Sequence, residues 1–229
     1  MSSNRPSKSR LKLRADHPEL KEGIRRNYDS IARWYDLAEG VLEWLGIRRQ
    51  RRALLSRARG RVLEVAVGTG VNLSLYPPGL HIDAVDLSAG MLERGRRKAA
   101  RMGLEATFHR MDAEALDFPD AYFDTVVSTL STCTFPNPLA ALKEMGRVLR
   151  PEGELLLLEH GLSDRGWLAR FQARRAERHF SAMGCRWDRH PPAWVQEAGW
   201  YLVTHHRFLL GMGHLMVLRV PGSRAMAPA

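Results

Sequence analysis

Hydrophobic residues recur along the central chain in short blocks that alternate between strand and helix patterns. From Arg61 onward, apolar runs of strand length alternate with segments whose apolar residues recur every three or four positions. The pattern predicts strands at 61–66, 81–86, 105–109, 123–128, 154–159, 200–208 and 213–220. It predicts helices near 70–76, 88–102, 137–149 and 191–198. This alternation indicates a parallel sheet covered by helices on both faces.

The last two predicted strands need a different connection. Only a few residues around 210–213 join them, which is too short for a parallel crossover, so these strands must form an antiparallel hairpin. The helix at 137–149 has its own start and stop signals, because Asn137 can cap it, Pro138 suits its first turn and RPEG at 150–153 closes it. We therefore expect an α/β, Rossmann-like fold with a seven-stranded, mostly parallel sheet and a C-terminal antiparallel hairpin.

Residues before Arg61 carry a helical pattern of their own. Leu20, Ile24, Tyr28 and Ile31 lie three or four positions apart, and further apolar residues follow up to Leu45. We expect two or three extra N-terminal helices. The predicted division is a disordered basic arm at 1–18, a helical cap at 19–58, the main domain at 59–221 and a disordered tail at 222–229. Residues 161–190 form the one long stretch between core elements, and such excursions tend to be lids or substrate-binding loops.

Composition narrows the class of protein. A chain of 229 residues with 45% hydrophobic residues suits one globular domain, and no apolar stretch reaches the roughly 18 residues that cross a bilayer. The two cysteines, Cys133 and Cys185, lack CxxC spacing, so the spacing indicates neither a disulfide scaffold nor a zinc site. We expect no metal, and we expect a reducing compartment, the cytoplasm.

The net charge of +10 is concentrated at one end of the chain. Residues 1–61 hold 16 Lys/Arg against 7 Asp/Glu, whereas the remainder holds 19 against 18. This asymmetry favours an anionic partner, either a membrane surface or nucleic acid, although a solvated arginine-rich face explains it equally well. Peripheral contact with the inner face of an anionic membrane is one expectation.

The stretch RVLEVAVGTG, from Arg61 to Gly70, carries the first chemical signal. Ligands of open α/β sheets bind beyond the carboxyl ends of the strands, where this loop leaves the first predicted strand. The second strand ends at Asp86, which can accept both hydroxyls of a ribose, and Asp112 follows the third. Successive strand tips thus offer sites for an anion, a ribose and a base.

Two kinds of nucleoside ligand fit such a rim. A dinucleotide fingerprint needs a third small residue for close packing of helix and strand, and Leu73 stands in its place. Glu64 would also repel a pyrophosphate. S-adenosylmethionine carries an amino group and a sulfonium, which a carboxylate attracts, so the residues favour S-adenosylmethionine.

Four motifs in order, LEVAVGTG, VDLSAGML, MDAEALDFPDAYFDTVVST and ALKEMGRVLRPEGELLLLEH, resemble the seven-stranded class I S-adenosylmethionine-dependent methyltransferases over about residues 25–220. The resemblance implies that Glu64, Val67, Gly68 and Gly70 hold the methionine part, with Ala66 in the same loop. It implies ribose binding by Asp86, adenine packing by Leu87 and Met91, and contact of Asp112 and Ala113 with the adenine amine. Ser128 would lie beneath the sulfonium. Tyr28 or Tyr35 would cover the cofactor, with Tyr35 favoured, and Tyr35 is also a candidate catalytic residue.

Closer resemblances compete within that superfamily. NYDSIARWYD is similar to the opening helix of ubiquinone/menaquinone-biosynthesis C-methyltransferases, and a related pattern occurs in bacterial phospholipid N-methyltransferases. STLSTCTF, RVLRPEGELLLLEH and GCRWDR resemble vertebrate methyltransferase-like proteins that are membrane-associated and methylate small thiols. The chain departs from the quinone enzymes at Glu159 and His160, which weakens the case for a quinone substrate.

Methyl transfer from a sulfonium expels a neutral leaving group, so alignment of the reactants can supply most of the catalysis. A base matters only where the acceptor must lose a proton, and His160, at the end of the fifth predicted strand, is the candidate. A structural histidine is the alternative. The predicted activity is methyl transfer to a small hydrophobic or lipid-like acceptor, a phospholipid amine, thiol or quinol. The rivals are an RNA methyltransferase, which lacks an NPPY-type motif here, and a non-catalytic binding module.

Overall fold

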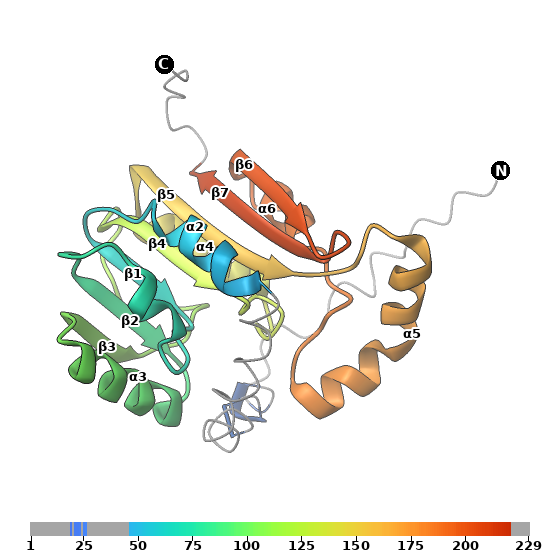
Figure 1. Ribbon diagram of the computed structural model, residues 1–229, viewed down its shortest axis with the longest axis horizontal. Helices are drawn as coiled ribbons and strands as arrows, with labels where there is room; N and C mark the ends of the chain where they lie inside the picture. The colour runs from blue at the N-terminus through green and yellow to red at the C-terminus, as the bar shows by residue number, and fades with distance from the viewer. Residues whose placement is uncertain (1–18, 20, 24, 27–45, 221–229) are drawn as a thin grey trace.

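A twisted seven-stranded sheet forms the centre of the computed structural model (Figure 1), which describes residues 19, 21–23, 25–26 and 46–220. The strand order is β3-β2-β1-β4-β5-β7-β6. β1 to β5 pair in parallel, whereas β7 is antiparallel to both β5 and β6. The strands are β1 (Val62–Val65), β2 (Ile82–Asp86), β3 (Ala106–Arg110), β4 (Phe123–Thr129), β5 (Leu149–His160), β6 (Tyr201–Phe208) and β7 (Gly213–Arg219). The predicted fold class and terminal hairpin are confirmed.

Helices connect the parallel strands, and local sequence signals begin them. The helices are α2 (Arg48–Leu55), the 3-10 helix η2 (Val71–Leu75), α3 (Ala89–Met102), α4 (Pro138–Val148), α5 (Gly166–Met183) and α6 (Pro191–Glu197). The Ser88 side chain accepts from the Met91 amide at the start of α3, and Asn137 accepts from the Ala140 amide at the start of α4. Each side chain satisfies an amide that has no partner within its helix, so the capping signals read at Asn137 and Pro138 are confirmed.

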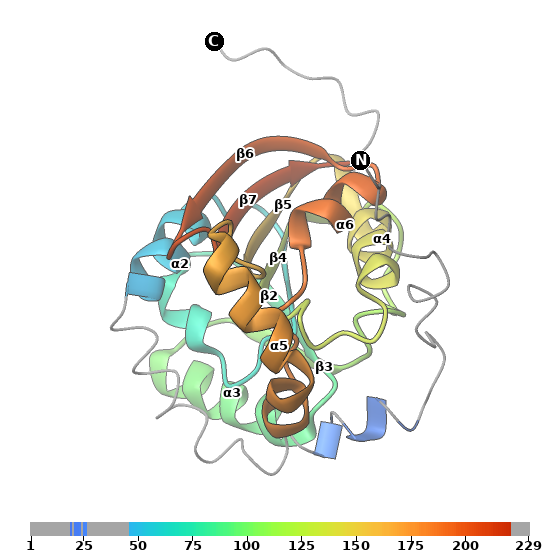
Figure 2. The ribbon, with the colours of Figure 1, turned by 90° about the vertical axis from the view of Figure 1, so that its right-hand side faces the viewer.

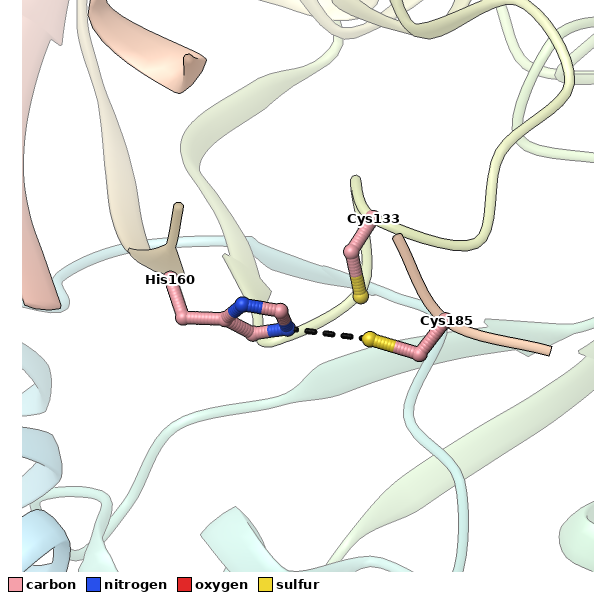
Figure 3. Close-up of side chains that lie close together, drawn as sticks. All are labelled: Cys133, His160 and Cys185. Carbon is pink, nitrogen blue, oxygen red and sulfur yellow. Dashed lines mark hydrogen bonds between the residues drawn. The ribbon is translucent and has the colours of Figure 1, made fainter. Parts of the chain in front are cut away.

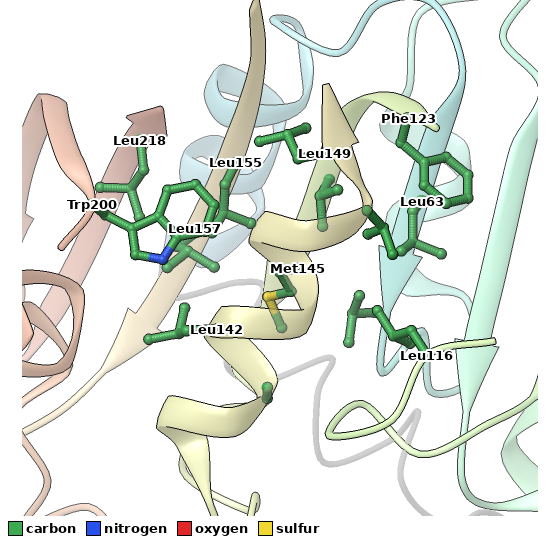
Figure 4. Close-up of a cluster of buried hydrophobic side chains, with 14 of the residues drawn as sticks. Leu63, Leu116, Phe123, Leu142, Met145, Leu149, Leu155, Leu157, Trp200 and Leu218 are labelled. Atoms are coloured by element: carbon green, nitrogen blue, oxygen red, sulfur yellow. The ribbon is translucent and has the colours of Figure 1, made fainter. Parts of the chain in front are cut away.

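Two hydrophobic clusters cover the two faces of the sheet, and Figure 4 shows the one on the α4 side. Figure 2 shows α2 and α4 on opposite sides of the sheet. α4 and α6 contribute to one cluster, and α2, η2 and α3 contribute to the other. The run Leu155–Leu158 divides between them, since alternate residues of a strand face opposite ways. A strand buried on both faces needs such a continuous apolar run.

Two predicted segments differ from the structure. Residues 150–153 belong to β5 and do not form a separate turn after the helix, because α4 ends at Val148 and β5 begins at Leu149. The stretch 161–190, expected as a loop, contains the 18-residue helix α5. Figure 1 shows α5 beyond the end of β5, away from the helices that cover the sheet.

Most of the predicted basic arm and helical cap lies outside the described residues, as does the tail from residue 221. The division into arm, cap, main domain and tail therefore stays a prediction. Among the helices in the described ranges, none combines the length and hydropathy that a membrane span needs.

Candidate active site

A cavity lies at the carboxyl ends of β1 and β4, where the strand order reverses. The empty space in the cavity and its mouth is about 990 Å³, which includes space open to solvent. Loops after β1, β2, β3 and β4 line it, together with α2 and described residues of the N-terminal segment. Open α/β sheets bind their ligands at the point where the strand order reverses.

Backbone conformation opens the cavity beside the loop after β1. Ala66, Gly68 and Gly70 have φ values of 55°, 56° and 77°, in the left-handed region that favours glycine. A Cβ on Gly68 would meet no atom within 4 Å, whereas one on Gly70 would lie 2.6 Å from Leu73 Cδ1. Gly68 therefore leaves backbone open toward the cavity, and Gly70 is required for packing. Leu130, which lines the cavity after β4, also has a positive φ, of 53°.

Asp86 holds the adjoining turn in place at the tip of β2. One carboxylate oxygen accepts from the Gly68 amide at 2.9 Å and the other from the Ser88 amide at 2.9 Å. The side chain lines the cavity, as do Leu87 and Met91. The structure thus brings the expected ribose acceptor and the two expected adenine contacts to one side of the cavity.

Asp112 lies at the next rim position and contacts the N-terminal segment. Lys21 Nζ lies 2.6 Å from Asp112 Oδ2 and 2.7 Å from Glu114 Oε2. These contacts raise the pKa of Lys21 although burial opposes the shift. Ala113 lines the cavity beside them. Lys21 lines the cavity too and was not identified from the sequence, because its contact crosses 91 residues.

Glu64 lies within β1, just before the loop expected to hold the methionine part, and its role toward the cofactor stays a prediction. Its side chain is buried on the α2 face of the sheet and accepts from Asn72 Nδ2 at 2.8 Å and from the Tyr76 hydroxyl at 2.9 Å. Burial raises its pKa to about 7, although these hydrogen bonds oppose the shift. Glu64 does not line the cavity, and neither do Gly70 and Ser128. Ser128 is buried and hydrogen-bonds to Ser131.

A buried polar network stands between Glu64 and the cavity. Arg51 Nη1 donates to Asn72 Oδ1 at 2.9 Å and to Thr129 Oγ1 at 2.5 Å, and all three residues line the cavity. Arg51 is only 3% exposed, so its charge acts in a poorly solvated place. In the sequence Arg51 is one of several arginines in a basic run, so nothing there indicated that it is buried and hydrogen-bonds at the cavity.

His160 ends β5 as expected but does not line the cavity. Its Nε2 lies 3.1 Å from Cys185 Sγ, and Cys133 lies beside both (Figure 3). Burial opposes protonation of His160, but its hydrogen bond to Cys185 raises the pKa of the imidazole overall. The Cys133 hydrogen bond and then His160 lower the pKa of Cys185. The role of His160 as a base stays a prediction. Tyr28 and Tyr35 lie outside the described residues.

The cavity residues fit S-adenosylmethionine. Gly68 offers open backbone, Asp86 and Asp112 offer acceptors at successive strand tips, and Leu87 with Met91 offers an apolar wall. A nucleoside with polar hydroxyls and a flat base needs this combination of groups.

Comparison with known proteins agrees with this geometry. A model described as a methyltransferase domain matches residues 63–157. Phosphatidylethanolamine N-methyltransferase of Cereibacter sphaeroides is 42% identical over 144 residues, which cover 61% of this chain and 70% of the relative. Demethylmenaquinone methyltransferase of Thermus thermophilus is 39% identical over 139 residues, which cover 58% of this chain and 63% of the relative, slightly under two thirds.

A solved structure has the same fold. The crystal structure of a proposed methyltransferase from Bacillus halodurans has a TM-score of 0.64 and 21% identity, and the match covers 74% of this chain and 97% of that one. The strand order, the cavity at the reversal of that order and the sequence relatives agree. The chain belongs to the S-adenosylmethionine-dependent methyltransferases, and S-adenosylmethionine is its cofactor.

Proposed function

We propose that this methyltransferase acts on a lipid-like acceptor at a membrane surface, with a phospholipid amine as the first candidate and a quinol or a small thiol next. The observation that carries the proposal is the 42% identity to a protein named phosphatidylethanolamine N-methyltransferase. Relatives named demethylmenaquinone methyltransferase support the quinol.

The residues of the cavity would supply binding and alignment. When bound, S-adenosylmethionine supplies an electrophilic methyl group on a sulfonium. Asp86 and Asp112 would accept from the nucleoside, and Leu87 and Met91 would pack against its base. Holding the acceptor in line at short range converts a bimolecular reaction into an effectively unimolecular one. A primary amine attacks only in its neutral form, and the phospholipid ammonium can lose its proton to bulk water before transfer. The proposal therefore gives no proton-transfer role to a residue of the cavity.

α5 supports the membrane location. Trp167 and Phe171 are 63% and 44% exposed and lie one turn apart on this helix. The same helix carries four arginines and one glutamate. Exposed aromatic residues beside arginines suit the boundary between anionic headgroups and acyl chains. The segment after α5 also reaches the cavity loop, because Arg189 Nη1 donates to the carbonyls of Thr132 and Phe135 at 2.8 and 2.9 Å.

A labelled-methyl transfer assay tests the acceptor. The full chain is incubated with methyl-labelled S-adenosylmethionine and, separately, phosphatidylethanolamine vesicles, an alkyl thiol, a demethylmenaquinol analogue or RNA. We expect label in the phospholipid, or failing that in the quinol or thiol. Transfer only to RNA would overturn the proposal, and so would transfer to none of these acceptors by protein that binds the cofactor.

Vesicle binding tests the surface. Replacement of Trp167 and Phe171 by alanine is expected to reduce co-sedimentation with anionic vesicles, because each of these exposed aromatic side chains contributes up to roughly 1.5–3 kcal/mol when it is fully transferred from water to the membrane. Tyr201→Ala, which removes a 55% exposed aromatic side chain from β6, is the control. Equal binding by the double variant and the control would argue against α5 as the membrane contact.

A further inference from the structure

Three side chains outside the cavity lining form a cluster whose chemistry the methyl-transfer proposal does not use. Cys133 follows β4, His160 ends β5 and Cys185 follows α5. One ligand atom from each of the three lies within 4.8 Å of the others. Figure 3 shows the two sulfur atoms and the imidazole directed toward one another. Both cysteines are free thiols.

The distances are close to those of a tetrahedral metal site. With metal–sulfur and metal–nitrogen distances of ~2.3 Å and ~2.0–2.1 Å, tetrahedral ligand atoms lie roughly 3.5–3.8 Å apart. The Nε2–Sγ distance of 3.1 Å between His160 and Cys185 is slightly shorter, and all pairs stay within 4.8 Å. Shifts of at most about 1 Å would therefore bring the three ligand atoms to tetrahedral spacing around such an ion.

The identity of the donors selects the metal. Two thiolates and one imidazole suit Zn²⁺ and exclude Mg²⁺ and Ca²⁺, which take oxygen ligands. We propose that Cys133, His160 and Cys185 bind one Zn²⁺ ion. Both cysteines bind as thiolates and the imidazole binds in its neutral form, so metal binding releases protons.

The surroundings fit an ion that links separate segments. Cys133 is 3% exposed, and its carbonyl accepts from the Arg186 amide at 3.2 Å, so the loop after β4 already contacts the segment after α5. The same loop lines the cavity through Leu130, Ser131 and Thr134. A bound ion would fix this loop, the end of β5 and the segment after α5 to one another without entering the cavity.

Titration of the full-length, reduced and chelator-treated protein with Zn²⁺ tests the proposal. Calorimetry is expected to give one site per chain. Cys133→Ser and Cys185→Ser should each weaken it more than about 100-fold, beyond the 10–100-fold loss that an outer-shell change causes. His206→Ala, which removes an exposed histidine from β6, should leave it unchanged.

A spectroscopic measurement on the unaltered chain covers the case in which a cysteine variant fails to fold. Co²⁺ in place of Zn²⁺ should give thiolate-to-metal charge transfer with tetrahedral d–d bands, and Zn²⁺ should abolish both. Absence of the charge-transfer band overturns the proposal. So does zinc affinity that Cys133→Ser and Cys185→Ser, shown to be folded by circular dichroism, leave intact. A Cys133–Cys185 disulfide that persists under the reducing conditions, seen by thiol counting, would also overturn it.

Discussion

Ala66 has a backbone conformation that normally selects glycine, with φ of 55°. The left-handed region costs an L-residue roughly 1–2 kcal/mol because Cβ approaches the following carbonyl oxygen. Here the alanine methyl group also packs against the hydrophobic cluster under α4. The cost of Ala66 is therefore one of backbone conformation.

We expect Ala66→Gly to cost little stability or none, because relief of the left-handed strain offsets the greater freedom that glycine gives the unfolded chain. Ala100→Gly, at an exposed position within α3, is the matched control and should cost about 1 kcal/mol. Urea denaturation of both variants measures the difference. An equal loss in the two variants would contradict the conformational argument.

Glu64 gives the protein a pH-dependent stability. Its pKa is raised from 4.5 to about 7 in the folded chain. Between these values the folded protein keeps a proton that the unfolded chain releases, so this contribution is complete below pH 4.5 and is lost as the pH rises through about 7. At 1.36 kcal/mol per pKa unit, the loss is at most about 3 kcal/mol.

Glu64→Gln is expected to flatten this dependence. Glutamine can accept from Asn72 and donate to the Tyr76 hydroxyl, but it carries no titrating proton. The free energy of unfolding, measured from pH 5 to 8, should fall more steeply for the unaltered chain than for the variant. Glu159, whose pKa burial also raises to about 7, contributes equally to both proteins. Parallel pH profiles would show that Glu64 does not titrate in this range.

Residues at strand tips could be predicted from the sequence, whereas residues brought in by tertiary packing could not. Asp86 ends β2 and Asp112 comes just after β3, so the strand pattern placed both at the cavity, whereas Leu87 and Met91 were expected there only from the resemblance to the family. Arg51 reaches Thr129 across 78 residues. The cluster of Cys133, His160 and Cys185 draws on three separate segments, and spacing rules detect only ligands that lie close in sequence.

At the scale of elements, α5 is the helix that hydrophobic patterning missed. Its buried positions include Gln172 and Ala176, at 2% and 3% exposure, while Trp167 and Phe171 face solvent. Because the buried positions hold a polar and a small residue, the hydropathy pattern of this segment lacks the helical period. The helices that cover the sheet were predictable because their buried faces are largely apolar. For α4, the cap at Asn137 gave a further signal.

Gln172 anchors α5 to the chain on either side of it. Its oxygen accepts from the Ser163 amide at 2.9 Å, and its Nε2 donates to the carbonyls of Gly161 and Trp187 at 3.1 and 3.2 Å. Gln172→Ala leaves these buried groups unpaired, at about 1–3 kcal/mol for each that water cannot reach.

We expect amide exchange across α5 to accelerate about 10–100-fold in Gln172→Ala, while β1 and β4 keep their protection. Gln196→Ala, at an exposed position of α6, should leave exchange unchanged. Hydrogen–deuterium exchange with peptide resolution makes this comparison. Uniform acceleration throughout the sheet would show that α5 does not open as a separate unit.

At the scale of the whole molecule, the order of the strands places three carboxylates that are distant in sequence in three different environments. β1 lies between β2 and β4, and β3 lies beyond β2. Glu64, within β1, is buried on the α2 face, Asp86 ends β2 at the cavity, and Asp112, just after β3, pairs with Lys21. Of the three carboxylates, Asp86 alone both lines the cavity and contacts the glycine loop. We therefore expect Asp86 to make the main carboxylate contact with the cofactor.

Asp86→Ala should therefore raise the Kd for S-adenosylmethionine at least about 10-fold, since hydrogen bonds to charged groups contribute about 1.5–3 kcal/mol. Asp86→Asn keeps the side-chain volume and one acceptor oxygen, so its Kd should fall between those of Asp86→Ala and the unaltered chain. Asp120→Asn, whose 78% exposed side chain pairs with Arg147 away from the cavity, is the control. Calorimetry gives the affinities, and thermal unfolding separates lost binding from a loosened loop, because Asp86 also accepts from the Gly68 amide. Normal affinity in a folded Asp86→Ala variant would remove Asp86 from the cofactor site and leave the β2 tip with a structural role alone.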